Sequence, residues 1–172
     1  VTNLLAVNPD DDMFDFTQGY SGTLKNCYGI WESGYTSTEA DPRGIEADGN
    51  LDGIYPDHLR QSDFTVENMT IVNNAANTTD NVDRMQDVIK IRRGAKATIT
   101  NALVKGTGGI IDLIDMNDSK GAGNAASSIS ITNTLNFKNK LNGTLNTFTE
   151  PTTNTGADAS LFTWTGYNFS SL

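Results

Sequence analysis

The chain has 172 residues, a formal net charge of −9 and a hydrophobic content of 37%. This length fits a single domain, and the acidic balance argues against a nucleic-acid-binding protein, which needs a basic surface. No apolar run is long enough to span a membrane, and the one cysteine, Cys27, excludes an intrachain disulfide and is expected to be a small packing residue.

Two short phrases recur along the chain. The first has a charged residue between apolar ones and occurs at residues 14–16, 45–47, 89–91 and 111–113. Apolar residues two positions apart predict strands with one buried face, and repeats at a fixed period indicate a solenoid. The second phrase is an apolar residue, a polar or charged residue and an asparagine, and its copies end at Asn3, Asn26, Asn68, Asn101 and Asn133.

The spacing of the phrases sets the size of one coil. The shortest repeat is about 22 residues, which suits a coil of two or three short strands. The copies that span 45–68 and 111–133 are about 10 residues longer, and the excess is expected to form loops. We therefore predict an all-β fold, a right-handed single-stranded parallel β-helix with about four complete coils, a half-coil at each end and one domain over residues 1–172.

Taken in order, the chain divides into wall segments and loops. Walls are expected at 14–16, 24–31, 43–50, 63–74, 87–105, 110–115 and 128–137, with polar loops between them. Residues 138–158 are expected to form an irregular hairpin or a cap-like cover, and no helix is expected. Residues 162–167 echo residues 14–20 and predict a terminal half-coil with Trp164 buried.

The half-coils at the two ends have two explanations. The first, which we favour, is that the chain is the C-terminal part of a longer solenoid, whose upstream coils complete the half-coil at residues 1–3. The second is that residues 1–3 of one molecule complete the coil of residues 162–164 in the next, building a filament head to tail. Solenoids otherwise need caps, because an open coil exposes a sheet edge.

The five asparagines are expected to stack as a ladder at one turn. An asparagine side chain both donates and accepts, so it can bond to the buried turn backbone and to the asparagines above and below it. The alternative is an antiparallel β-sandwich in which the asparagine pattern is fortuitous.

With this ladder, residues 12–16, 43–50 and 87–94 resemble right-handed parallel β-helices of the pectate-lyase superfamily, and secreted β-helix proteins of Bacteroidota. The resemblance covers nearly the whole chain and implies an extracellular or bacterial cell-surface location. It also implies a carboxylate-held Ca²⁺ that neutralises an acidic polysaccharide, and a Lys or Arg base. On this chain the base would be Lys90, Arg92 or Arg93, and the metal ligands would be Asp15, Glu46 and Asp48.

Stacking the first phrases predicts an outward row of Asp15, Glu46, Lys90 and Asp112, about 5 Å apart from coil to coil. A second row, three residues earlier, would hold Asp12, Arg43, Asp87 and Gly109. The alternative to a binding site is that opposite charges alternate simply because like charges on adjacent strands repel.

A second candidate metal site is the run D-x-N-x-D-G, which opens an EF-hand-type Ca²⁺ loop with oxygen ligands at alternate positions. Its ligands would be Asp48, Asn50 and Asp52, and Gly53 permits the turn. The twelfth position is Leu59 rather than the expected Glu, so Asp57 would have to substitute for it.

Exposed aromatic residues are candidates for stacking on sugar rings. Trp31, Tyr35 and Tyr55 are the residues that the sequence offers for this role. The leading functional hypothesis is a secreted or cell-surface structural or adhesive module that binds glycans or assembles end to end. The alternative is a Ca²⁺-dependent polysaccharide lyase or a fragment of one.

Overall fold

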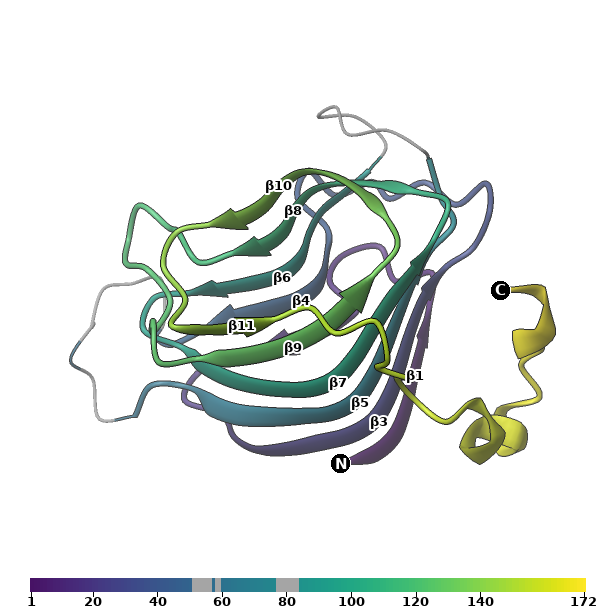
Figure 1. Ribbon diagram of the computed structural model, residues 1–172, viewed down its shortest axis with the longest axis horizontal. Coiled ribbons are helices and arrows are strands. Elements are labelled where there is room, and N and C mark those ends of the chain that lie inside the picture. The colour runs from purple at the N-terminus through teal and green to yellow at the C-terminus, as the bar shows by residue number, and fades with distance from the viewer. Residues whose placement is uncertain (51–56, 58–59, 77–83) are drawn as a thin grey trace.

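The computed structural model describes residues 1–50, 57, 60–76 and 84–172 and shows two parallel β-sheets that face each other across one core (Figure 1). The six-stranded sheet has the order β1-β3-β5-β7-β9-β11, and the five-stranded sheet has the order β10-β8-β6-β4-β2. Every strand pairing in both sheets is parallel. The strands of the six-stranded sheet are Thr2–Val7, Ser21–Trp31, Asp63–Asn73, Lys96–Gly106, Ser128–Asn133 and Thr147–Thr149. Those of the five-stranded sheet, in chain order, are Phe14–Phe16, Arg43–Asp48, Met85–Arg92, Gly109–Asp115 and Asn136–Asn142.

The chain alternates between the sheets, so each coil is one strand of the five-stranded sheet followed by one of the six-stranded sheet. This arrangement confirms the predicted all-β parallel solenoid. It has one more coil than expected, because β10 and β11 form a regular coil where we expected an irregular cover over residues 138–158. No helix in the described part of the chain is long and apolar enough to cross a membrane.

The core is built from apolar ladders, as period-2 strands with one buried face require. In the five-stranded sheet one ladder contains Phe14, Ile45, Ile89 and Ile114, all buried. Each such side chain contributes about 1.5–3 kcal/mol when it leaves water. Cys27 is a fully buried member of this core, and burial raises the pKa of its thiol to about 12. The thiol is therefore a packing group, as the sequence suggested. The matching ladders of the six-stranded sheet are Leu24, Val66, Ile99 and Ile129, and Cys27, Met69, Ala102 and Ile131.

Four asparagines mark the bend in the long strands. Asn3, Asn26, Asn68 and Asn101 have φ between 52° and 57°, a left-handed conformation that asparagine tolerates better than most residues. They are stacked in bonded pairs, because Asn26 Nδ2 donates to Asn3 Oδ1 at 2.9 Å and Asn101 Nδ2 donates to Asn68 Oδ1 at 2.8 Å.

Asn133 does not belong to this ladder, and its predicted place was wrong. The register between β7 and β9 pairs Ile99 with Ile129 but Ala102 with Ile131, so β7 has one extra residue at the bend. Asn133 consequently lies beside Val104, past the bend. Its amide instead closes a local turn, accepting from Leu135 N at 3.1 Å and donating to Leu135 O at 3.0 Å.

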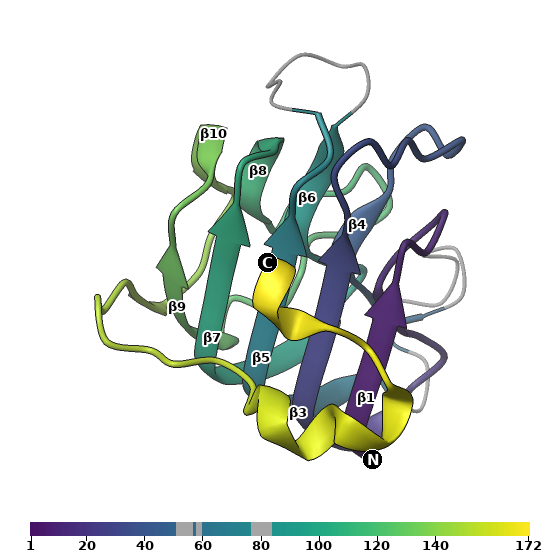
Figure 2. The ribbon, with the colours of Figure 1, turned by 90° about the vertical axis from the view of Figure 1, so that its right-hand side faces the viewer.

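The C-terminal segment forms no half-coil, which corrects another prediction. Residues Ala159–Thr165 form a 3₁₀ helix, η1, and Phe169–Ser171 form a second one, η2. The segment crosses the outside of the six-stranded sheet from the last coil toward β1, as the yellow ribbon shows in Figure 2. Trp164 is 72% exposed, whereas Phe162 is fully buried. Residues 162–164 therefore lie in a 3₁₀ helix and not in a half-coil, and assembly of the chain end to end stays a prediction.

The asparagines at the bend hold this C-terminal tail, which we define as residues 150–172. Asp158 N donates to Asn26 Oδ1 at 2.6 Å, and Asn26 Nδ2 donates back to Asp158 O at 3.4 Å. Thr155 N donates to Asn101 Oδ1 at 2.8 Å. Ala157 N is held between these points by Thr70 Oγ1 at 2.9 Å. The asparagines therefore serve one another and a segment outside the coils, rather than only the buried turn that we expected.

Aromatic packing fixes the far end of the tail. The ring of Phe162 meets that of Tyr28 edge-on, with centroids 6.1 Å apart, and belongs to an apolar cluster with Ile30 and Val72 on the outer face of the six-stranded sheet. Phe169 packs on the same tyrosine at 4.9 Å. This second small core explains why Tyr28 and Ile30 are buried although the neighbouring Cys27 already faces the main core.

Replacement of Asn101 should separate its two roles. Asn101→Ala is expected to lower the free energy of unfolding by about 2–3 kcal/mol, because alanine is more strained than asparagine at positive φ and the tail bonds are lost. Asn101→Gly loses the same bonds without the strain and should cost about half as much. Urea unfolding of both variants measures the difference, and equal losses would contradict the assigned strain.

Candidate functional site: the charged outer face of the five-stranded sheet

Charged side chains line the outer face of the five-stranded sheet in two rows. One row runs Asp15, Glu46, Lys90 and Asp115, with each residue beside the next on an adjacent strand. Lys90 thus lies beside Asp115, whereas the sequence analysis had placed it beside Asp112. The other row runs Arg43, Asp87, Asp112 and Asn139.

The predicted register of β8 was wrong by three residues, and the reason lies in its sequence. Residues 110–114 are apolar except for Asp112, so both Asp112 and Asp115 look like the outward residue of the phrase. The structure aligns Ile114 with Ile89 and Ile110 with Met85. The spacing of phrases alone does not distinguish the two alignments.

Arg43 connects three carboxylates at the centre of the face. Its guanidinium donates to Asp87 Oδ2 at 2.9 Å, to Asp41 Oδ2 at 2.8 Å and to Glu46 Oε1. Burial by itself lowers the pKa of Arg43, but these carboxylates outweigh it and raise the pKa above its ordinary value. Burial also raises the pKa of Glu46, against the opposing effect of Arg43 and Arg92. The group is therefore a closed ionic network in which arginine supplies the positive charge.

Three further cations of the face are also paired. Arg92 binds Asp48 through Nε at 2.6 Å and Glu46 through Nη2 at 2.8 Å. Arg93 binds Asp118 through Nε at 2.6 Å. Lys90 Nζ donates to Asp115 Oδ2. All three residues that the resemblance offered as a base are thus ion-paired with carboxylates.

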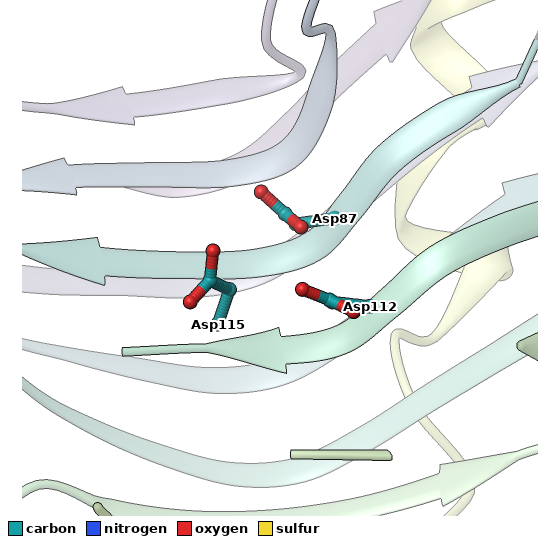
Figure 3. A group of neighbouring side chains, drawn as sticks. All are labelled: Asp87, Asp112 and Asp115. Carbon is teal, nitrogen blue, oxygen red and sulfur yellow. The ribbon is translucent and has the colours of Figure 1, made fainter. Parts of the chain in front are cut away.

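Three carboxylates that the sequence reasoning did not group together converge beside Lys90. Asp87, Asp112 and Asp115 each offer one oxygen within 4.8 Å of the others, and Figure 3 shows the three side chains facing a common space. All three are buried. Burial raises the pKa of Asp87 to about 6, although its bond from Arg43 opposes the shift. The signal that could have found this group is the correct register of β8, which puts Asp112 beside Asp87.

The residues proposed for metal binding from the sequence are placed differently. Asp15 is exposed and lies beside Glu46, whose carboxylate is bound by Arg43 and Arg92. In the D-x-N-x-D-G run, Asp48 is bound by Arg92 and Arg93.

The rest of that run is only partly described. Asn50 is buried, and neither polar atom of its side chain has a hydrogen-bond partner among the described residues. Asp57 is exposed, and Asp52 lies outside the described residues. A Ca²⁺ ion on this run therefore stays a prediction.

The two aromatic candidates in the described part of the chain are not exposed rings on which a sugar could stack. Trp31 is 2% exposed and its Nε1 donates to Pro9 O at 3.0 Å, so its prediction as a stacking residue was wrong. Tyr35 is half-buried against Trp31, with ring centroids 5.4 Å apart. Tyr55 lies outside the described residues. The exposed indole of the described part is that of Trp164, which the half-coil prediction had buried.

Comparison with known proteins identifies the family of the chain. The model of the pectate-lyase-like β-helix domain matches residues 1–168. No curated protein and no solved structure matches the chain. The parallel coils, the asparagine bend and a match over nearly the whole sequence agree: the chain belongs to the pectate-lyase-like β-helix domain family.

Proposed function

We propose that this chain is a non-catalytic module, secreted or carried on a cell surface, that presents the outer face of its five-stranded sheet to a glycan. The observation that carries the proposal is the pairing of Lys90, Arg92 and Arg93 with carboxylates. A base that abstracts a proton has to be available in its deprotonated form. Each of these three side chains is instead engaged as a hydrogen-bond donor to a carboxylate.

The polar groups of the face suit hydroxyl-rich ligands. Asp112 accepts from Asn139 Nδ2 at 2.6 Å, and Asn142 Oδ1 accepts from Asn117 Nδ2 at 2.7 Å. Such carboxylate and amide pairs offer both acceptors and donors to sugar hydroxyls. The carboxylates of the face outnumber its cations, so a neutral polysaccharide is a better ligand than a uronate, whose charge they repel.

Affinity electrophoresis in gels that contain neutral or acidic polysaccharides tests this function. Retardation by a neutral polysaccharide is expected, and it should be lost in Asn139→Ala, which removes the amide from the face. The matched control is Asn146→Ala, because Asn146 is an exposed asparagine of the same coil that lies outside the two charged rows. Retardation only by acidic polysaccharides, or equal retardation of all three proteins, would contradict the proposal.

A polysaccharide lyase is the second candidate, and one observation favours it. Lys90 lies within hydrogen-bonding distance of Asp115, beside the group of three carboxylates, so a base and a cation-binding group would be neighbours. In that case polygalacturonate with added Ca²⁺ should yield an unsaturated product, detected by ultraviolet absorbance. Lys90→Ala should abolish that product, while Lys96→Ala, on the other sheet, should not. If the unaltered chain forms no unsaturated product, the lyase hypothesis is rejected.

A further inference from the structure

The two ends of the solenoid both present edge strands. The six-stranded sheet ends in β1 on one side and in β11 on the other, and the five-stranded sheet ends in β2 and β10. The β1–β2 end and the β10–β11 end therefore lie at opposite ends of the stack of coils (Figure 1). An edge strand presents a row of backbone N–H and C=O groups that no neighbouring strand binds, so it can pair with a strand of another chain.

The β1–β2 end is apolar and unprotected. The exposed large apolar side chains of the described residues all lie in β1, immediately before it, or in η1, which contacts β1 (Figure 2). A cavity of about 400 Å³ opens at this end, lined by Met13, Phe14 and Phe16 among others. Strand β1 contains neither a charged residue nor a proline, which commonly protect exposed edges. The exposed apolar side chains are Val1, Leu4, Val7, Leu161 and Trp164.

The last coil ends the same apolar ladders at the opposite side of the stack. Leu141 of β10 stands in the ladder that begins with Phe14. Phe148 of β11 stands in the ladder of Leu24, and Val1 lies beside Leu24, one position before the first register pair of β1 and β3. Leu141 and Phe148 are both half-buried. A second copy that continued the stack would therefore place apolar side chains on apolar side chains in both sheets.

The charges of the two ends are complementary. Lys138 precedes Leu141 by three residues, and Asp11 precedes Phe14 by three residues, so the two charges hold the same register position. Both side chains are exposed, and neither forms an ion pair with another described residue. Two β1–β2 ends placed against each other would instead bring together acidic groups, Asp11 and Asp15 of each copy, which repel. The charges thus favour contact between unlike ends.

We propose that copies of this chain assemble head to tail, with β10 and β11 of one copy adding in parallel beside β2 and β1 of the next. Every strand pair of the solenoid is parallel, so β11 already has the orientation that continues the sheet at the free edge of β1. The two contacting surfaces differ, so the contact does not close on itself and repeats into a filament. It uses the last coil rather than residues 162–164, which the sequence had offered for this contact.

The filament leaves the proposed glycan-binding face free. The outer face of the five-stranded sheet runs along the side of the stack, and the contact covers only the two ends. Assembly therefore does not depend on whether that face binds a glycan, and the two proposals can fail separately.

Sedimentation velocity of the unaltered chain from about 1 μM to about 1 mM tests the assembly. We expect a sedimentation coefficient that rises steadily with concentration and passes beyond that of a dimer. Leu4→Arg puts a charge on the apolar β1–β2 end, and Phe148→Arg puts one on the β10–β11 end, so each should weaken association at least about tenfold. Lys138→Glu, which opposes Asp11 with a like charge, should weaken it about fivefold. The matched control is Thr100→Arg, at an exposed position of the central strand β7, and it should change nothing.

A mixture of the two arginine variants tests the direction of assembly. Leu4→Arg keeps an intact β10–β11 end, and Phe148→Arg keeps an intact β1–β2 end. Together they retain one functional contact, so the mixture should form dimers of one copy of each variant and nothing larger. A mixture that forms no dimers contradicts contact between unlike ends.

Each result decides the question. A chain that stays monomeric at every concentration overturns the proposal, and so does a dimer that grows no further, because a closed dimer uses the same surface of both copies. Association that both arginine variants leave unchanged also overturns it. If circular dichroism shows that either arginine variant is unfolded, Lys138→Glu decides: weaker association supports the contact, and unchanged association overturns it. Because no polysaccharide is present, a filament that forms while polysaccharide binding is absent contradicts the proposed function alone.

Discussion

The Phe162→Ala variant is expected to lose about 3–5 kcal/mol of the free energy of unfolding, the largest loss that we predict for one side chain. Phe162 is fully buried between η1 and the outer face of the six-stranded sheet, where it packs with Tyr28, Ile30 and Val72. Removal of the Phe162 ring leaves a cavity, and the cluster has too few other side chains to fill that cavity. Urea unfolding, followed by circular dichroism, measures the loss.

Trp164→Ala is the matched control, because it removes a larger aromatic side chain from the same 3₁₀ helix. Trp164 is 72% exposed, so its loss should change the free energy of unfolding by no more than about 0.5 kcal/mol. The terminal half-coil inferred from the sequence would instead bury both side chains and predicts a large loss for both variants. Equal losses for the two variants would contradict the packing of the tail.

The Phe162→Ala variant should also loosen the tail where it crosses the coils. Residues 154–158 are held by side-chain bonds to Asn101, Thr70 and Asn26, and these bonds depend on a tail that is anchored beyond them. Hydrogen exchange of the Thr155 and Asp158 amides should accelerate in Phe162→Ala but not in Trp164→Ala. Unchanged exchange would mean that the asparagines hold the tail without help from the aromatic cluster.

The fold was predictable because its signal is repeated. Each coil carries the same alternation of apolar residues, so errors in one copy are corrected by the others. The bend was predictable as well, since asparagine is one of the few residues that adopt positive φ readily. What these asparagines bind was not predictable, because their partners at residues 155 and 158 are far away in the sequence.

The charged face was predicted less well, for two physical reasons. A run of apolar residues in β8 allows two registers, and a shift in register changes every neighbour on the face. The prediction for Asn133 was wrong for a related reason, since the extra residue of β7 at the bend shifts the register of all later residue pairs between β7 and β9. The predicted half-coil in the tail was wrong because residues 162–167 repeat the apolar pattern of a wall strand, whereas Asp158 and Gly166 cap a 3₁₀ helix there. Caps act locally and override the weak similarity to the first coil.

Asp12 provides the second large effect, through the pH dependence of stability. It precedes β2 on the charged side of the coil, and its Oδ1 is buried without a hydrogen bond among the described residues. Burial first, and then the negative charge of Glu46, raise the pKa of Asp12 to about 8, although Arg43 opposes the shift. At neutral pH the carboxyl group is therefore largely protonated in the folded chain and ionised in the unfolded chain.

The Asp12→Asn variant should consequently become more stable relative to the unaltered chain as the pH rises. Because the pKa of Asp12 is higher in the folded state, the folded state binds more protons between about pH 4 and pH 8, and stability falls across that window by up to about 1.4 kcal/mol per pH unit. Asparagine carries no charge, so the variant escapes this loss, which totals several kcal/mol by pH 9. The variant should match the stability of the unaltered chain near pH 4.

Asp11→Asn, at the exposed neighbouring position, is the control and should show no gain in stability that grows with pH. Urea unfolding at pH 4, 6, 8 and 9 measures the free energy of unfolding of both variants. An equal gain in stability from Asp12→Asn at all four pH values would refute the raised pKa, because a group that titrates in this range makes the gain depend on pH.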